Sequence, residues 1–444
     1  MKHIQRFFWA YLLGLTALWW LTDPPAWAQL TDFFSWRATL MQYSGVLGMG
    51  VMSLAMVLAV RPVCFEPYLG GLDKMYRLHK WLGISALVLS ISHWALAVVP
   101  KWAVGWGWLA RPVRGPKPVL AEGSIEQWFM SQRGLAEGIG EWAFYAAAVL
   151  MVLALVKRFP YRHFFKTHHL LAVAYLVLVA HSVILLKFDD WRGLLGPVMA
   201  VLMAAGSVAA VMVLLGRVVN RRPCVGEVVG IRHHAALEVV QVDIAFKGRW
   251  PGHEAGQFAF VTLHEHEGPH PYTISSAWRN DGRVTFIIKA LGDYTRALAQ
   301  TLELKDVVEV EGPYGRFNFQ GPTRRQIWVG GGIGITPFIS RMKALAQSPD
   351  GKAIDLFHTT AVYDPQVMDL MAQDARDAQV RLHVLWDERD GRLDAARIAA
   401  QVPAWRDADV WFCGPARFGQ ALKNELVAMG LVPARFHQEL FEMR

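Results

Sequence analysis

Six long uncharged stretches lie within the first 216 residues of the chain. An α-helix rises about 1.5 Å per residue, so about 20 apolar residues cross the roughly 30 Å of hydrocarbon in a bilayer. The pattern therefore predicts a bundle of six transmembrane helices. The stretches are residues 7–22, 38–60, 81–100, 142–156, 167–186 and 194–216, of which the fourth is short and is expected to extend outward to residue 139.

Charge is divided unevenly between the two halves of the 444-residue chain. Residues 1–220 hold 19 Lys and Arg against 10 Asp and Glu, whereas residues 221–444 hold 26 against 27. The positive excess thus belongs to the loops of the predicted membrane domain. A nucleic-acid-binding surface would gather Lys and Arg on a soluble domain, so this class of function is excluded. Hydrophobic residues make up 53% of the chain and charged ones 18%, which excludes a disordered protein.

Two basic clusters orient the predicted bundle. They lie at residues 157–166 and 217–222, and the positive-inside rule assigns both to the cytoplasm, so six spans leave both termini inside. Two features oppose this topology. The outer loop at residues 101–138 carries five basic side chains, and residues 1–28 end in Ala26-Trp27-Ala28, as a cleavable signal peptide does. Cleavage would leave five spans; we favour a retained first span.

The sequence pattern changes after residue 223. Short segments rich in β-branched residues and separated by Gly or Pro predict an antiparallel β-barrel at residues 225–231, 238–246, 257–263, 283–289 and 307–311. Strands then alternate with helical segments, which predicts an α/β domain whose parallel strands lie at residues 327–329, 355–359, 381–385 and 410–412. The expected domains are residues 1–220, 221–321 and 322–444.

Four histidines lie at two matched depths in the third and fifth predicted spans. His79 and His93 are 14 residues apart, which places them about 21 Å apart on nearly one helix face. His168 and His181 are 13 residues apart, so the depths match, but the faces differ by about 140° and a bend or π-bulge is expected in the fifth span. His169 is a rival to His168, and the matching offset favours His168.

Paired imidazoles at two depths suit two stacked haems, each held by one histidine from each helix. Ligation by two histidines leaves no open position on the iron, which favours electron transfer over oxygen binding at the metal. The alternative is that these side chains only bond neighbouring helices, as polar residues do in membrane bundles. A single histidine would favour that alternative, and four at matched depths favour haem. His163 lies in a basic loop, and His264 and His266 are expected to be solvated in a hairpin loop rather than to form a metal site.

A glycine-rich turn follows the first strand of the α/β domain. The segment from Gly330 to Pro337 reads Gly-Gly-Gly-Ile-Gly-Ile-Thr-Pro and opens a helix. Glycines let the backbone approach a pyrophosphate, and a helix start presents unpaired amides and a partial positive charge. This context, strand before and helix after, predicts a dinucleotide site.

In this order of segments the chain resembles the ferric reductase and NADPH oxidase superfamily. The resemblance implies six spans, haem ligation by His79, His93, His168 and His181, and a ferredoxin-NADP reductase-like pair of domains. It implies FAD, two b-type haems and NADPH or NADH as cofactors. The implied flavin contacts are His270, Pro271, Tyr272, Thr273, Ser275 and Ser276, followed by Lys289, Gly292, Asp293 and Thr295.

The resemblance also assigns the nicotinamide end of the site. It implies contacts from Gly331, Gly332, Gly334, Thr336 and Pro337, and from Gly414 and Pro415. Cys413 would lie beside the nicotinamide, and an aromatic near the C-terminus would cover the flavin. Phe441 is our candidate for that aromatic, and Phe436 is its rival. A small buried core residue is the alternative for Cys413.

The implied function is electron transfer from cytoplasmic NAD(P)H through FAD and two haems to an acceptor outside a bacterial inner membrane. Family members that make superoxide carry a further histidine one turn beyond the outer ligand and an arginine on the second span. Here that position is Ala97 and residues 38–60 contain no arginine, so a ferric chelate, a quinone and oxygen all remain candidate acceptors. Residues 358–363 lack the arginine expected for NADPH, which Arg389 or Arg392 would have to replace. The competing hypotheses are a haem-binding redox sensor and a nicotinamide-gated transporter; the sequence leaves the oligomeric state open.

Overall fold

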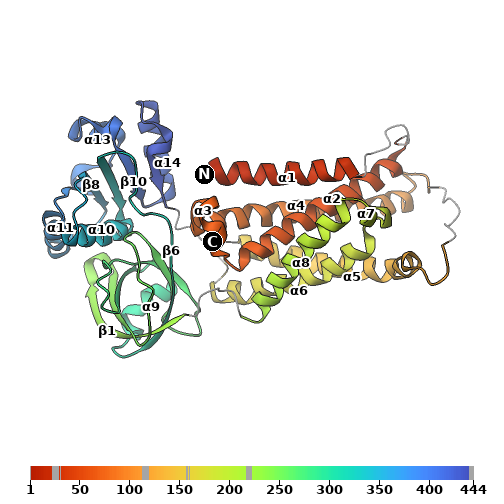
Figure 1. The fold of residues 1–444 in the computed structure, drawn as a ribbon, viewed down its shortest axis with the longest axis horizontal. Coiled ribbons are helices and arrows are strands. Elements are labelled where there is room, and N and C mark those ends of the chain that lie inside the picture. Colours follow the sequence, from red (N-terminus) through yellow and green to blue (C-terminus); the bar gives the residue numbers. More distant parts are fainter. Residues whose placement is uncertain are drawn as a thin grey trace. The chain divides into compact units, whose positions relative to one another are not determined.

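The computed structural model describes residues 2–22, 30, 32–112, 120–156, 159, 161–216 and 223–439. The chain folds as two compact units, residues 1–220 and residues 221–443. The first unit is helical, and the second contains two β-sheets with their helices (Figure 1).

Long helices that run alongside one another build the first unit (Figure 1). They are α1 (Lys2–Thr22), α2 (Phe33–Ala59), α4 (Leu72–Gly105), α5 (Ile125–Leu155), α6 (Tyr161–Leu185) and α8 (Leu195–Leu214), with the short α3 (Glu66–Leu69) and α7 (Phe188–Arg192). Within the described residues, five are long and apolar enough to cross a membrane: α2, α4, α5, α8 and the Lys166–Leu185 part of α6. Five of the six expected spans are therefore present by length and composition. The remaining one, α1, falls outside this set; its first turns are polar and charged, and three tryptophans and a tyrosine follow among the apolar residues.

Helices α1, α2, α4, α5 and α6 all begin earlier than the uncharged stretches suggested, and in α2 and α5 a capping side chain stands at the start. α2 begins at Phe33 because the Asp32 side chain accepts a hydrogen bond from the Ser35 amide, at 2.7 Å. α5 begins at Ile125 because Ser124 accepts one from the Gln127 amide, at 3.2 Å. The expectation of a loop over residues 101–138 is therefore wrong, since capping side chains and not the first charged residue set where these helices start.

Helix α1 packs as a member of the bundle. Leu15 and Trp19 are buried in one core cluster with residues of α2, α6 and α8. The Tyr11 hydroxyl donates a hydrogen bond to the Gly50 carbonyl of α2, at 2.7 Å. The segment Ala26 to Ala28, which resembled a cleavage site, lies outside the described residues.

The first sheet of the second unit is antiparallel and has the order β4-β3-β6-β1-β2-β5. Its strands are β1 (Cys224–His234), β2 (Val239–Phe246), β3 (Phe258–Thr262), β4 (His270–Thr273), β5 (Arg283–Lys289) and β6 (Val307–Tyr314). Alternate residues of β5 are buried, as expected for a strand with one face on the core. An isolated bridge between Ile274 and Phe286 links the end of β4 to β5. Helix α9 (Asp293–Thr301) follows β5.

The second sheet is parallel and has the order β11-β10-β7-β8-β9. Its strands are β7 (Arg325–Gly331), β8 (Ala353–Thr360), β9 (Arg381–Trp386), β10 (Asp409–Cys413) and β11 (Phe436–Gln438). Helices α10 (Thr336–Gln347) and α11 (Pro365–Asp377) share one core cluster with the sheet, and α13 (Ala395–Gln401) and α14 (Ala416–Ala428) share another. Covering on both faces explains the continuous apolar runs of the central strands. Strand β11 was not expected, since its three residues include no β-branched side chain.

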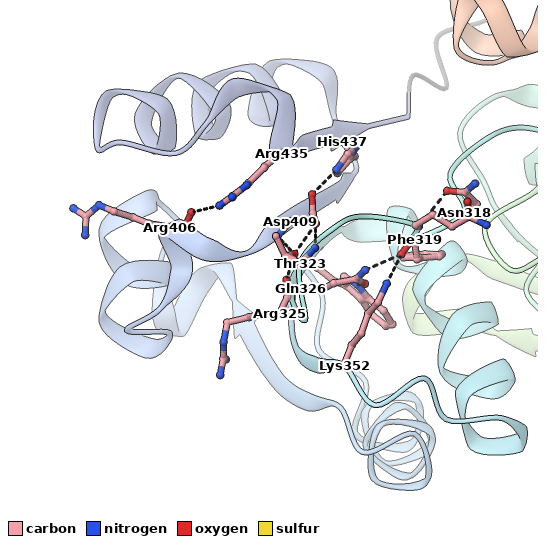
Figure 2. A network of polar contacts seen from close by, with 12 residues as sticks. Asn318, Phe319, Thr323, Arg325, Gln326, Lys352, Arg406, Asp409, Arg435 and His437 are labelled. Carbon is pink, nitrogen blue, oxygen red and sulfur yellow. Dashed lines mark hydrogen bonds and ion pairs between the residues drawn. The ribbon is translucent and has the colours of Figure 1, made fainter.

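The buried carboxylate of Asp409 ties β11 to the rest of this unit. Figure 2 shows Thr323 and His437 converging on it: the Thr323 hydroxyl donates to one carboxylate oxygen, and His437 Nε2 lies 2.9 Å from the other. Burial pushes the pKa of Asp409 upward, but these hydrogen bonds and the His437 ring more than offset it, so the pKa lies below its ordinary value. The His437 ring also stacks on Trp411, with centroids 4.2 Å apart. These contacts fix the short edge strand that leads to Glu439.

Candidate functional site

A cavity of about 1550 Å³ in the second unit is lined by residues of both sheets. It brings together segments far apart in the sequence: the end of β4, the end of β5, the turn after β7 and the turn after β10. Of the residues that the sequence and its resemblance singled out, the cavity is lined by Pro271, Tyr272, Thr273, Lys289, Thr295, Gly331, Gly332, Gly334, Thr336, Gly414 and Pro415. Arg392 lines it as well, and the other candidates that the structure describes do not.

The hydroxyls of Ser275 and Ser276 form hydrogen bonds to the protein backbone. Ser275 is fully buried and donates to the Thr285 carbonyl at 2.9 Å, and Ser276 accepts from the Thr285 amide at 3.1 Å. His270 stacks on Tyr294 with ring centroids 4.8 Å apart, and neither ring lines the cavity. Pro271, Tyr272 and Thr273 are therefore the parts of this motif that form the cavity wall.

The start of α9 is closed by a local hydrogen-bond turn. Gly292 is the N-cap, and the Thr295 hydroxyl accepts from the Gly292 and Leu291 amides at 3.0 and 2.9 Å. Asp293 is fully exposed and 3.5 Å from Arg296, so it belongs to the surface. Lys289 at the end of β5 is the cationic side chain that this segment contributes to the cavity.

The turn after β7 lies directly against the end of β10. A Cβ on Gly334 would collide with the Cys413 carbonyl, whose carbon would be 2.6 Å away. A Cβ on Gly331 would lie 3.0 Å from the Pro415 ring. Glycine at these two positions lets the strand ends approach each other, and the N-terminus of α10 then opens onto the cavity. Pro337 is buried in the first turn of α10.

Neither Cys413 nor Phe436 lines the cavity. Cys413 is fully buried and does not line the cavity, and burial, aided by the nearby Glu439 carboxylate, raises the pKa of its thiol. It is therefore a neutral packing residue at neutral pH. Phe436 lies in the core, where its ring stacks on Phe412 at 6.2 Å. Phe441 lies outside the described residues.

Glu439 is a cavity residue that sequence reasoning missed. It is 3% exposed and lines the cavity beside Gly414 and Pro415. The chain reaches this position only because β11 pairs with β10, and that strand carried no sequence signal. A buried carboxylate at the C-terminal edge of a parallel sheet is a group that nucleotide chemistry can use.

His358 predicts a pH dependence of stability. It is 4% exposed at the end of β8, and burial lowers its pKa to about 4, opposed by its contact with the Gly330 carbonyl. The unfolded chain, with a pKa of 6.5, binds the proton first, so this contribution is complete above pH 6.5 and is lost as the pH falls towards 4. The expected loss is about 3 kcal/mol.

Urea unfolding followed by flavin release measures this effect. The stability advantage of the wild type over His358→Gln should shrink between pH 6.5 and pH 4. The same change at the exposed His266 is the control and should leave the slope unaltered. Parallel curves for wild type and His358→Gln would contradict the prediction.

In the first unit, α4 and α6 bring the four membrane histidines together in two pairs. The rings of His79 and His168 have centroids 6.0 Å apart, and those of His93 and His181 are 6.5 Å apart. His168, not its neighbour His169, faces His79. α6 is α-helical throughout, so of the two expected irregularities, a bend or a π-bulge, the π-bulge is absent. An imidazole on a rotatable stem reaches several Å around its helix, which reduces the rotation that the backbone must supply.

In three of these four histidines, the ring nitrogen Nδ1 lies within hydrogen-bond distance of a protein oxygen. His79 Nδ1 lies 2.9 Å from the Ala55 carbonyl, and His181 Nδ1 lies 2.8 Å from the Ala136 carbonyl. His93 Nδ1 lies 3.0 Å from the Ser44 hydroxyl. Histidines that bind metals usually have this second contact, which fixes the tautomer and leaves Nε2 for the metal.

The separations fit one metal between each pair. A first-row metal binds imidazole nitrogen at about 2 Å and the ring centre lies about 1 Å further on, so two rings on opposite sides of one metal have centroids about 6 Å apart. Among the described residues no group of three or more His, Cys, Asp or Glu side chains could hold a metal ion. With no third side chain, a metal between two such imidazoles would take its remaining ligands from outside the protein, from water or from a macrocycle.

The second helix carries an arginine after all. Because α2 begins at Phe33, it includes Arg37, whose Nε donates to the Leu96 carbonyl at 2.6 Å. Its Nη2 lies 3.4 Å from the Ala97 carbonyl. Residues 38–60 contain no arginine, but the inference that the helix lacks one is wrong.

His264 and His266 do approach each other, with ring centroids 5.6 Å apart. His264 Nδ1 lies 3.0 Å from the Tyr294 hydroxyl. No third ligand joins them within the part of the chain that the structure describes.

Comparisons with known proteins agree with this arrangement. Residues 44–179 match the family described as ferric reductase like transmembrane component, and residues 234–318 match the FAD-binding domain family. A flavohemoprotein of Bordetella pertussis is 28% identical over 218 residues, 44% of this chain and 54% of that protein. A stachydrine N-demethylase reductase subunit of Rhizobium meliloti is 27% identical over 209 residues, 43% of this chain and 58% of that protein.

The chain therefore spans little more than half the length of these curated relatives. Among solved structures, an Amycolatopsis cytochrome P450 reductase is 22% identical with a TM-score of 0.44, and the match covers 50% of this chain and 70% of that one. The two family matches place a ferric reductase-like transmembrane component before an FAD-binding domain on one chain, which is the order expected from the resemblance to the ferric reductase and NADPH oxidase superfamily.

Proposed function

We propose that this protein is a transmembrane oxidoreductase that takes electrons from NAD(P)H in the cytoplasm and delivers them to an acceptor across a bacterial inner membrane. One observation carries the proposal: two pairs of histidine rings, 6.0 and 6.5 Å apart, lie at two depths of a helical bundle. The nucleotide cavity of the second unit supplies the donor end. Helix α1 is the sixth span in this proposal, because it packs into the bundle core.

The proposed cofactors are FAD and two b-type haems. When bound, the flavin accepts a hydride from the nicotinamide and the haems carry single electrons. His79 and His168 would hold the inner haem, and His93 and His181 the outer one. In the cavity, Tyr272 would pack on the flavin ring, and the amides at the start of α10 would meet a pyrophosphate.

The choice of nicotinamide nucleotide depends on one arginine. Arg389 is paired with Asp390 at 2.9 Å, whereas Arg392 lines the cavity. Arg392 is therefore the better candidate to meet a 2′-phosphate, and NADH remains the alternative donor. The proposed acceptor is a small molecule, either a ferric chelate, a quinone or oxygen, and Arg37 lies at the outer end of α2 where an anionic acceptor would arrive.

Optical spectra of the purified full-length protein test the proposal. We expect two haems per FAD, and b-type bands that appear when NADH or NADPH is added anaerobically. His79→Ala and His181→Ala should each lose one haem, about half of the total. His169→Ala is the matched control and should keep both, because His169 is not part of either ring pair.

Two other results would contradict the proposed function. A preparation without a Soret band would rule out the proposal. Haem that is reduced by dithionite but not by NAD(P)H would instead indicate a sensor.

A further inference from the structure

The two histidine pairs differ in the hydrogen-bond partners of their Nδ1 atoms. In the outer pair, both Nδ1 atoms meet oxygens, the Ser44 hydroxyl at His93 and the Ala136 carbonyl at His181. In the inner pair, His79 meets the Ala55 carbonyl. His168 Nδ1 is buried with no hydrogen-bond partner among the described residues, and its ring stacks on Phe164 at 5.0 Å. Ser44 is the one side chain in this set of contacts.

The hydrogen-bond directions at Ser44 define the tautomer of His93. Ser44 is 7% exposed, and its hydroxyl donates to the Met41 carbonyl at 3.1 Å. A hydroxyl has one proton, so towards His93 it can only accept, at 3.0 Å. We infer that the proton of the ring is on Nδ1, which leaves the lone pair on Nε2.

We propose that Ser44 is a positioning residue that holds His93 in the Nδ1–H tautomer and lowers the reduction potential of the outer haem. The proposal rests on the ligand role of His93 in the proposed function. A hydrogen bond donated by Nδ1–H makes the imidazole a more basic ligand, and a more basic ligand stabilises the oxidised iron. Removing the hydroxyl takes away one of the two oxygens that meet this N–H and leaves the Met41 carbonyl, so the ring is held less firmly and the ligand becomes less basic.

Potentiometric titration of the full-length protein, followed by its haem bands, tests this role. Ser44→Ala should move one of the two haem components to more positive potential and leave the other in place. Ser44→Thr keeps a hydroxyl and should restore the wild-type titration. Ser53→Ala is the matched control on the same helix: Ser53 is also buried, but its hydroxyl contacts Tyr175 at 2.8 Å, and it should shift neither component.

A double variant shows to which haem the shift in potential belongs. In His168→Ala, which should retain only the outer haem, the single remaining component should move on adding Ser44→Ala. Two haems with unchanged potentials in Ser44→Ala would overturn the inference while leaving the proposed function intact, and so would an equal shift of both components. Absence of haem from the wild type would instead overturn the proposed function.

Discussion

Replacing Gly140 with alanine is expected to remove one of the two haems. Gly140 lies on α5, and a Cβ there would overlap the His181 ring, with Cε1 only 2.5 Å and Cγ 2.6 Å away. The backbone of α5 is thus the surface on which this imidazole rests, and the Ala136 carbonyl one turn earlier fixes its Nδ1. An added methyl must displace the ring, because helix backbone cannot yield by this distance.

The consequence should be confined to the outer site. Displacing an oriented ligand weakens metal binding by about 10- to 100-fold or more. The haem content measured by pyridine haemochrome should fall from two per chain to one, with the spectrum of the His79–His168 site retained.

Gly138→Ala is the matched control. Gly138 lies on the same helix, and a Cβ there meets nothing within 4 Å. This variant should keep both haems. Two haems with an unaltered spectrum in Gly140→Ala would mean that His181 does not bind one in this orientation.

The second large effect is expected at Gly334. A Cβ at this position meets only backbone: the Cys413 carbonyl, with its carbon at 2.6 Å, and the Gly414 amide at 2.8 Å. Backbone at a strand end cannot rotate out of the way as a side chain can. Gly334→Ala should therefore push the turn after β7 and the turn after β10 apart by about 1 Å, and a displacement of this size lowers a transfer rate by on the order of 100-fold.

Stopped-flow reduction of the flavin by NADH or NADPH measures this loss. Dithionite does not need the cavity, so it should still reduce flavin and haem in the variant, which separates a damaged site from a damaged fold. Gly248→Ala, an exposed glycine with nothing within 4 Å, should behave as the wild type. A wild-type rate in Gly334→Ala would show that the turn is not part of the nucleotide site.

The membrane part shows how far a local pattern reaches. Residue spacing alone matched His79 with His168 and His93 with His181, and both pairs form. The same reasoning expected a bend or a π-bulge in the fifth span, and the π-bulge does not occur; ideal helix angles ignore the reach of a side chain. Spacing also predicted that the second span begins at residue 38 and therefore missed Arg37. The helix begins at Phe33 because Asp32 caps it.

In the second unit, too, the sequence pattern predicted some features and missed others. Alternating strands and a glycine-rich turn predicted both sheets, and the glycine-rich turn does line the cavity. β11 and Glu439 were missed, since three residues at an edge gain their conformation from pairing with β10 and from the contact of His437 with Asp409.

Periodicity and spacing were therefore sufficient for the element types, the order of the two units and the identity of the paired histidines, because these depend on neighbours along the chain. The oxygens behind the imidazoles, the glycines against which His181 and Cys413 rest, and the carboxylate in the cavity come from segments up to a hundred residues away. Such contacts exist only after packing has brought those segments together, and no local pattern encodes them.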